Sequence, residues 1–139
     1  MTLAVFFPAV LTAVLILTSP LGAEESPSKK IPNFFYLEDD IAGGGLPDED
    51  ALRNLAISGY KTIVDLRMPE EGISDEKILA AEIGLKYFNI PLRGADIGIP
   101  AAKKLDEILK NTENHPVFIH CRSGTRVRLL WNVYKKKAS

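Results

Sequence analysis

The sequence predicts one α/β domain of three layers, with a mainly parallel central sheet flanked by helices. Two observations lead to this fold class. From residue 33 onward, short runs rich in β-branched and aromatic side chains alternate with helix-like segments of about ten residues, a pattern typical of parallel strands joined by right-handed helical crossovers. The chain of 139 residues also has room for one ordinary domain with its own core, and no internal repeat or low-complexity segment interrupts the alternation.

The N-terminal part of the chain differs in composition from the rest. The first 23 residues carry no charged side chain, and an apolar block at residues 3–17 is followed by helix breakers and small residues. This pattern resembles a signal peptide cleaved after Ala23; an uncleaved membrane anchor is the alternative, although the block is shorter than the ~20 residues of a spanning helix. We therefore expect residues 1–23 to be a signal peptide or anchor, 24–32 a polar linker and 33–139 the folded domain. The protein is expected to be exported, periplasmic or secreted, and to touch a membrane only through an uncleaved N-terminal segment.

The first elements of the domain are two strands and a helix. Short strands are expected at residues 33–37 (NFFYL) and 41–44 (IAGG), on either side of the acidic turn at residues 38–40. A helix should begin near residue 47, where the first turn is acidic (PDED), and end at Gly59. The apolar face of this helix consists of Leu52, Leu55 and Ala56.

The middle of the chain repeats the alternation of strand and helix. A strand is expected at residues 61–66 (KTIVDL), and another at residues 85–90 (LKYFNI). Between them, Ser74 begins a helix that Gly84 ends. The apolar side of this helix is expected to consist of Ile78, Leu79 and Ile83.

The last third of the chain completes the sheet. A helix should begin at Pro100, with Leu105, Ile108 and Leu109 at helical spacing, and a buried strand should follow at residues 116–120 (PVFIH). A final helix begins near residue 127 and ends in three lysines. Ligands of such sheets bind beyond the carboxyl ends of the strands. This rule places three loops at one edge, namely residues 67–72, 93–99 and 121–126.

One of these loops contains the residues with the clearest chemistry, residues 120–126 (HCRSGTR). A strand that feeds a helix leaves unpaired N–H groups at the helix N-terminus, which form an anion cradle together with the helix dipole. We expect Cys121 at the mouth of this cradle, with its thiolate favoured by the dipole and by Arg122 and Arg126, so that it acts as a nucleophile. A small buried hydrophobic cysteine is the alternative.

Composition excludes several classes of function. The net charge of −1 indicates no broad nucleic-acid surface, so any attraction for anions must be local. The single cysteine cannot form an internal disulfide. His115 and His120 are isolated from other types of ligand, so we expect neither a metal site nor a cofactor.

Four segments carry a family resemblance: residues 44–47 (GGLP), 59–67 (GYKTIVDLR), 84–92 (GLKYFNIPL) and 116–121 (PVFIHC). They resemble the dual-specificity/tyrosine phosphatase-like superfamily, and most closely its small bacterial domain that is also found fused to β-lactamase-like hydrolases. The resemblance implies a cysteine-phosphatase-like fold, a cysteine nucleophile that forms a phosphocysteine, an arginine that binds two phosphoryl oxygens, and an aspartic acid from the preceding loop.

The loop departs from that family pattern in its length. Such phosphatases place five residues between the cysteine and the arginine, whereas four separate Cys121 from Arg126, as in rhodanese-like sulfurtransferases. Val127 also stands where a serine or threonine usually follows the arginine. Three functions therefore remain open: a phosphatase of phosphomonoesters, including phosphotyrosine; a sulfurtransferase that forms a persulfide on Cys121; and an inactive anion-binding module. The expected partner is a phosphorylated or other anionic substrate, either a small molecule or a protein.

Each candidate site residue has an expected role. Cys121 is the nucleophile, Arg126 binds the anion, and His120 supports the loop by hydrogen bonding. A phosphate ester needs an acid on a mobile neighbouring loop, and Asp96 is the best candidate because glycines flank it; its alternative role is that of a loop or helix-cap residue. Arg67 and Arg93 could add positive charge. The remaining candidates form the substrate-binding loop: Arg122, Ser123, Gly124 and Thr125.

Overall fold

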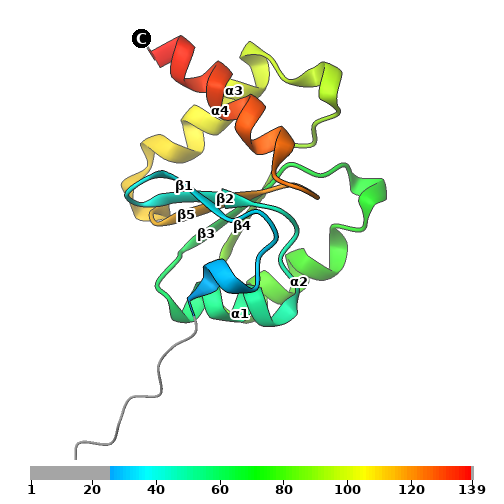
Figure 1. Cartoon of the computed structure of the whole chain (residues 1–139), viewed down its shortest axis with the longest axis vertical. Coiled ribbons are helices and arrows are strands. Elements are labelled where there is room, and N and C mark those ends of the chain that lie inside the picture. The colour runs from blue at the N-terminus through cyan, green and yellow to red at the C-terminus, as the bar shows by residue number, and fades with distance from the viewer. Residues whose placement is uncertain (1–25, 139) are drawn as a thin grey trace, which may run out of the picture.

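A five-stranded sheet forms the middle layer of the computed structural model, which describes residues 26–138 (Figure 1). The strand order is β1-β2-β5-β3-β4, and every neighbouring pair is parallel except the antiparallel pair β1 and β2. The predicted three-layer domain with a mainly parallel sheet is thus confirmed. The strands are β1 (Phe35–Glu38), β2 (Ile41–Gly44), β3 (Thr62–Asp65), β4 (Lys86–Asn89) and β5 (Val117–His120).

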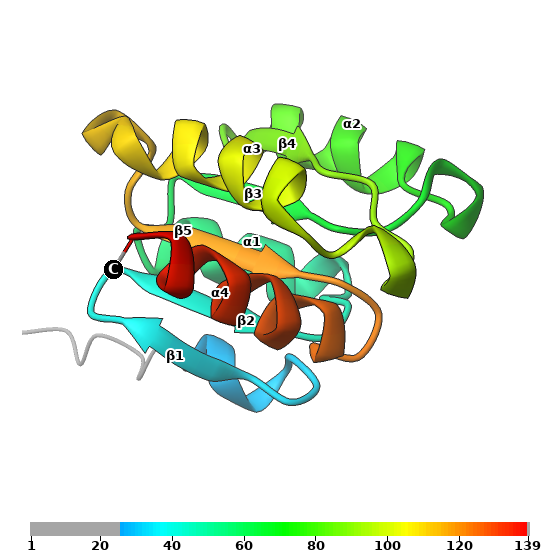
Figure 2. The same ribbon diagram turned by 90° about the horizontal axis from the view of Figure 1, so that it is seen from above.

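Two pairs of helices cover the two faces of the sheet. One face carries α1 and α2, and the other carries α3 and α4, as Figures 1 and 2 show. Among residues 26–138, no helix is long and apolar enough to span a membrane. The helices are α1 (Glu49–Ile57), α2 (Ser74–Glu82), α3 (Ile99–Lys110) and α4 (Thr125–Ala138).

The start of the packed domain lies earlier than residue 33. Residues Pro27–Lys29 form a 3-10 turn, and Ile31 is only 3% exposed because its side chain packs under β2 at Gly44. Ile31 therefore belongs to the core, although it falls within the expected linker at residues 24–32. The expected signal peptide or anchor at residues 1–23 lies outside the described residues.

Helix α1 begins two residues later than the sequence predicted. The Asp48 carboxylate accepts a hydrogen bond from the Ala51 N–H at 2.7 Å and so caps the helix. The predicted apolar face is confirmed for Leu52 and Leu55, which are buried against the sheet.

The buried face of α2 was predicted correctly for Leu79 and Ile83, which pack against the core, but wrongly for Ile78. Ile78 is 59% exposed, whereas Glu76 and Ala80 are the buried residues of this helix. A carboxylate can replace an apolar side chain on the inner face only when it is paired, and Glu76 is paired with Arg67 and His120. This ionic cluster lies beneath α2, so Glu76 occupies the inner face and Ile78 is left exposed, against what hydrophobic spacing alone indicates.

Strand β5 lies at the centre of the sheet and is buried along its whole length. Phe118 packs toward α1 and α2, while Ile119 packs toward α3 and α4. In the sheet register His120 is opposite Gly44 on β2 and Asp65 on β3. The last residue of β5 is thus held on both sides, and the loop that follows starts from a rigid point at the carboxyl edge of the sheet.

Candidate active site

Cys121 lies at the base of the loop between β5 and α4. Its N–H donates to the carbonyl oxygen of Gly44 at 3.4 Å, and the Gly124 N–H donates to its Sγ at 3.1 Å. The residue is only 1% exposed, so the expectation that it stands at the mouth of the cradle is corrected. The loop turns back over the sulfur, and one of its amides points at that atom.

Gly124 makes this turn possible. Its φ of +89° lies in the left-handed region, which side-chain-bearing residues rarely adopt. A Cβ at this position would also approach the Phe35 ring to 3.3 Å and the backbone of Gly44 to 3.4 Å. Both the backbone conformation and the close packing therefore require glycine where the amide turns toward the sulfur.

Hydrogen bonds from residues before β1 and after β2 hold the outer part of the loop between β5 and α4. The Leu46 N–H donates to the carbonyl oxygen of Arg122 at 3.0 Å, and Asn33 donates from its side chain to the Ser123 carbonyl oxygen at 3.0 Å. A Cβ at Gly45 would lie 2.9 Å from that Arg122 oxygen, so this glycine permits the close approach. The Ser123 and Thr125 hydroxyls are exposed and lie 3.2 Å apart.

Arg126 joins the loops that follow three different strands. Its Nη1 donates to the carbonyl oxygens of Leu66, after β3, and Leu92, after β4, at 3.3 and 3.0 Å. Its two terminal nitrogens also bind the two carboxylate oxygens of Glu71 at 2.8 and 2.9 Å. The Glu71 carboxylate raises the pKa of Arg126, and the nearby Cys121 sulfur contributes further. The guanidinium is therefore permanently charged and fixed in orientation beside the thiol.

Glu71 was not among the residues singled out in the sequence. Hydrogen bonds from Arg126 lower its pKa to about 2, helped by the Met68 N–H and by Arg122, whose Nε lies 3.5 Å away. At neutral pH Glu71 is ionised and cannot donate a proton. The available signal was its place in the loop at residues 67–72, which the sequence analysis assigned to the same edge of the sheet as Cys121.

The Glu71 pair predicts a specific dependence of stability on pH. Glu71→Gln is expected to lower the free energy of unfolding at pH 7 by about 1 kcal/mol, a value that allows for solvent screening of this partly exposed pair. Since the pKa is about 2 in the folded chain against an ordinary 4.5, the contribution is complete above pH 4.5 and is lost as the pH falls toward 2. Urea unfolding of both proteins across this range measures the difference.

Glu70→Gln is the matched control, because Glu70 lies in the same turn and forms an exposed ion pair with Arg93. We expect it to change the free energy of unfolding by less than about 0.5 kcal/mol. A difference between wild type and Glu71→Gln that stays constant from pH 7 to pH 3 would contradict the assignment.

A buried ionic cluster supports Cys121 from the opposite side. His120 is fully buried; its Nδ1 lies 3.2 Å from the Cys121 carbonyl oxygen and its Nε2 lies 2.5 Å from Glu76 Oε1. Arg67 donates to Asp65 and to Glu76, both at 2.8 Å, and the Tyr87 hydroxyl donates to Asp65 at 2.7 Å. The ring of His120 is therefore held by hydrogen bonds at both nitrogens.

The cluster balances opposite charges within the core. Burial is the largest single influence and acts to raise the pKa of Asp65, but the hydrogen bonds from Arg67 and Tyr87 and the nearby His120 together outweigh it, so the pKa of this carboxyl is lowered. Atoms of Asp65, Glu76 and His120 lie within 4.8 Å of one another, a spacing that could hold a metal ion. Here the Arg67 guanidinium binds both carboxylates and supplies the positive charge. The sequence indicated His120 as a residue that supports the loop by hydrogen bonding, but not its partner Glu76 or the pairing with Arg67, because these residues come from separate elements.

Asp96 caps its own turn in the loop after β4. It ends the 3-10 turn Gly94–Asp96, and its carboxylate accepts a hydrogen bond from the Arg93 N–H at 3.0 Å. The residue is exposed. The loop is tied to the site at Leu92, through Arg126, rather than at Asp96. The role of Asp96 as the acid stays a prediction.

Comparison with known proteins identifies relatives of this domain. Residues 27–130 match the family described as DSP-PTPase phosphatase fused to NAD+ kinase. A β-lactamase hydrolase-like protein of Xylella fastidiosa (strain Temecula1) is 31% identical over 100 residues, which cover 68% of this chain and 23% of that protein. The inositol diphosphatase DSP5 of Arabidopsis thaliana is 30% identical over 98 residues, 67% of this chain and 48% of that protein. The matched region thus spans between about a quarter and a half of these relatives.

Solved structures show the same architecture. A DUF442 protein of Shewanella putrefaciens superposes with a TM-score of 0.72 at 18% identity, covering 81% of this chain and 76% of that one, and shows the fold. The catalytic core of the PP-IP phosphatase SIW14 of S. cerevisiae, solved with citrate, has a TM-score of 0.66 at 27% identity, covering 76% and 67%. The fold, its cysteine loop and the match over residues 27–130 agree. The chain therefore belongs to the DSP-PTPase family of phosphatases, as a small domain of the dual-specificity/tyrosine phosphatase-like type.

Proposed function

We propose that this chain is a cysteine-dependent phosphatase that hydrolyses phosphomonoesters, including phosphotyrosine, through a phosphocysteine intermediate on Cys121. One observation carries the proposal: the Gly124 amide points at the Cys121 sulfur in a loop that Arg126 closes. A sulfur held by amide donors at the start of a helix is suited to attack an anion that the same donors bind. Membership of a phosphatase family supports this assignment.

The reaction would proceed in two displacements. The Cys121 thiolate attacks phosphorus, so that the S–P bond forms as the P–O bond to the leaving group breaks, and an acid protonates the leaving oxygen. Water then attacks phosphorus and gives a proton to the residue that acted as the acid, while the S–P bond breaks and releases phosphate and the thiolate. Arg126 binds two phosphoryl oxygens in both steps, while Glu71 positions its guanidinium. The acid proposed for the first step is Asp96, after it leaves the Arg93 amide.

A second function is favoured by the length of the loop. Four residues between Cys121 and Arg126 close a narrower ring of amides than five do, and a terminal persulfide sulfur fits such a ring more readily than a tetrahedral phosphate. In this alternative, the Cys121 thiolate takes the outer sulfur of thiosulfate with release of sulfite, and a nucleophile such as cyanide then removes that sulfur.

A paired assay on the purified chain separates these functions. Release of phosphate from an aryl phosphate is measured beside release of thiocyanate from thiosulfate and cyanide. Phosphate release without thiocyanate is the expected result. Thiocyanate release without phosphate would overturn the proposal in favour of sulfur transfer. Absence of both products, with phosphate still bound, would identify an inactive anion-binding module.

The pH profile tests the role of Asp96. Asp96→Asn is expected to lower kcat on an aryl phosphate by about 10²-fold and to remove the fall in rate at alkaline pH, because the amide has no proton to donate. Asp39→Asn, in the exposed turn between β1 and β2, serves as the control and should leave the profile unchanged. An unaltered pH profile of the Asp96→Asn variant would contradict the role of Asp96 as the acid and leave it only the role of capping its turn.

A further inference from the structure

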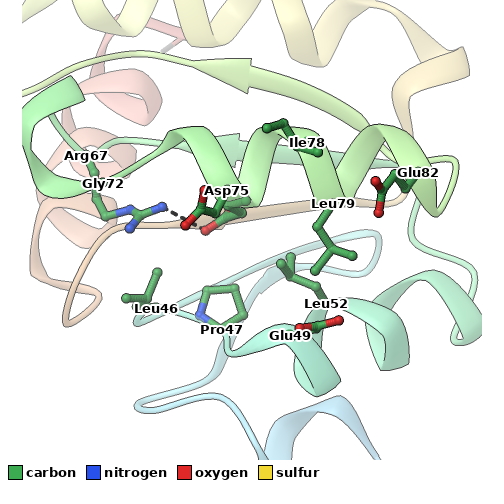
Figure 3. A pocket seen from close by; sticks show the side chains of 11 residues that line it. Leu46, Pro47, Glu49, Leu52, Arg67, Gly72, Asp75, Ile78, Leu79 and Glu82 are labelled. Carbon is green, nitrogen blue, oxygen red and sulfur yellow. Dashed lines mark hydrogen bonds and ion pairs between the residues drawn. The ribbon is translucent and has the colours of Figure 1, made fainter.

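A groove of about 410 Å³ lies between α1 and α2, on the face of the sheet that carries these helices (Figure 3). Its floor is apolar, and it continues onto the exposed Ile78 of α2. Figure 3 shows Leu46 and Pro47 from the segment before α1, Leu52 from α1 and Leu79 from α2 directed toward the same space, whereas the side chain of Ile78 is directed away from it. The apolar lining consists of Leu46, Pro47, Leu52, Ile78 and Leu79.

The rim of this groove is acidic. Asp75 and Glu82 line it, are exposed, and form no ion pair with any residue in the described part of the chain, 26–138. Glu49 also lines it and shares its charge with Arg53 at 2.7 Å. The one basic side chain of the lining, Arg67, is neutralised by its buried carboxylate partners. A ligand of this groove should therefore combine positive charge with an apolar portion.

Two residues that line the groove are also connected to the loop that contains Cys121. Leu46 lines the groove with its side chain, and its N–H binds the Arg122 carbonyl oxygen. Gly72 lines the groove as well and directly follows Glu71, which binds Arg126. A substrate seated with its phosphate at the Cys121 loop therefore meets the near end of the groove.

The length of the groove favours a polypeptide over a small molecule. It follows α2, whose nine residues span roughly 13 Å at 1.5 Å per residue. About four residues of extended chain cover this distance. A small phosphate ester held at Cys121 would leave the groove empty, and a polyanionic ligand would be repelled by Asp75 and Glu82.

We propose that this groove binds the segment flanking the phosphorylated residue of a protein substrate, and that it selects basic and aliphatic residues in that segment. The inference rests on the proposed phosphatase activity and names its substrate class. The aliphatic side chains pack on the apolar floor, and a lysine or arginine lays its stem along that floor with its charge at Asp75 and Glu82.

Kinetics on matched phosphotyrosine peptides test the proposal. Three peptides of equal length carry Lys and Leu, Glu and Leu, or Gly and Ala around the phosphotyrosine, and an aryl phosphate serves as the reference. We expect kcat/KM to be about tenfold higher for the Lys and Leu peptide than for the Glu and Leu peptide at low salt, because Asp75 and Glu82 attract the lysine and repel the glutamate. The difference should shrink in 0.5 M salt.

The double variant Asp75→Asn, Glu82→Gln identifies the groove as the origin of this preference. It should reduce the preference to less than threefold and leave the rate on the aryl phosphate unchanged. Glu107→Gln on α3, which covers the other face of the sheet, is the matched control and should retain the full preference. A variant that loses activity on all substrates would contradict the assignment of these carboxylates to the flanking segment.

The outcomes separate failure of the groove from failure of the phosphatase. Hydrolysis of the aryl phosphate with equal rates on all three peptides would overturn the groove and leave the phosphatase standing. No hydrolysis of the aryl phosphate would overturn the phosphatase itself. The chain could instead form a dimer at high concentration. If Asp75→Lys disrupted that dimer and left the kinetics on the three peptides as in wild type, a second copy of the chain would occupy the groove, and the proposal would be overturned.

Discussion

Replacement of Cys121 by serine is expected to lower phosphate release from an aryl phosphate by more than about 10³-fold. A serine hydroxyl at this position stays protonated and is a far weaker nucleophile than a thiolate, and among residues 26–138 no base contacts this side chain to activate it. The amide of Gly124 and the guanidinium of Arg126 remain, so phosphate should still bind. Initial rates and phosphate binding measured on the same preparation give both quantities.

Alkylation provides an independent check on the same sulfur. Although Cys121 is buried, a substrate has to reach it, so iodoacetamide should inactivate the wild-type chain at neutral pH and phosphate should protect it. The Ser variant should unfold at a urea concentration close to that of wild type, since serine retains the space and the hydrogen bond from Gly124. Activity retained in the Ser variant, or a thiol no more reactive than free cysteine, would contradict a nucleophilic role.

Arg67→Met is expected to lower the free energy of unfolding by about 3–5 kcal/mol. The substitution removes the cation that binds the carboxylates of Asp65 and Glu76, both buried, and leaves them facing each other in the core. Methionine fills much of the volume, so the loss would come from the uncompensated charge rather than from a cavity. Urea unfolding followed by the fluorescence of Trp131, the single tryptophan, measures it.

The dependence on pH distinguishes charge from packing in this variant. Without the guanidinium, burial acts against fewer favourable partners and should raise the pKa of Asp65 in the folded variant relative to wild type, so that the variant takes up this proton at a higher pH. The difference in the free energy of unfolding between wild type and Arg67→Met should therefore be smaller at pH 5 than at pH 7. Arg53→Met, which removes an exposed pair with Glu49, is the control and should cost less than about 0.5 kcal/mol. A deficit of equal size at both pH values would indicate lost packing instead.

The fold could be predicted because its signals are local. Runs of β-branched residues, apolar spacing of 3.6 residues, and glycines or prolines at the boundaries each act within about ten residues, and they placed each of the five strands and four α-helices of residues 26–138 within a few residues of its observed bounds, although they did not predict the short 3-10 turns. The exception is instructive. In α2 the spacing favoured Ile78 as a buried residue, but Glu76 is buried instead because its partners come from the loop after β3 and from the end of β5.

The sequence by itself determined the domain class, the edge of the sheet that bears the site, and the loop around Cys121, since all of these depend on neighbours along the chain. Only the tertiary structure decided that Glu71 holds Arg126 and that Glu76 holds His120. These partners are separated by 55 and 44 positions, and no local pattern specifies which carboxylate meets which cation. Charges pair according to where the strands and helices bring them, because the cost of burying an ion is met only by an opposite charge within hydrogen-bond distance.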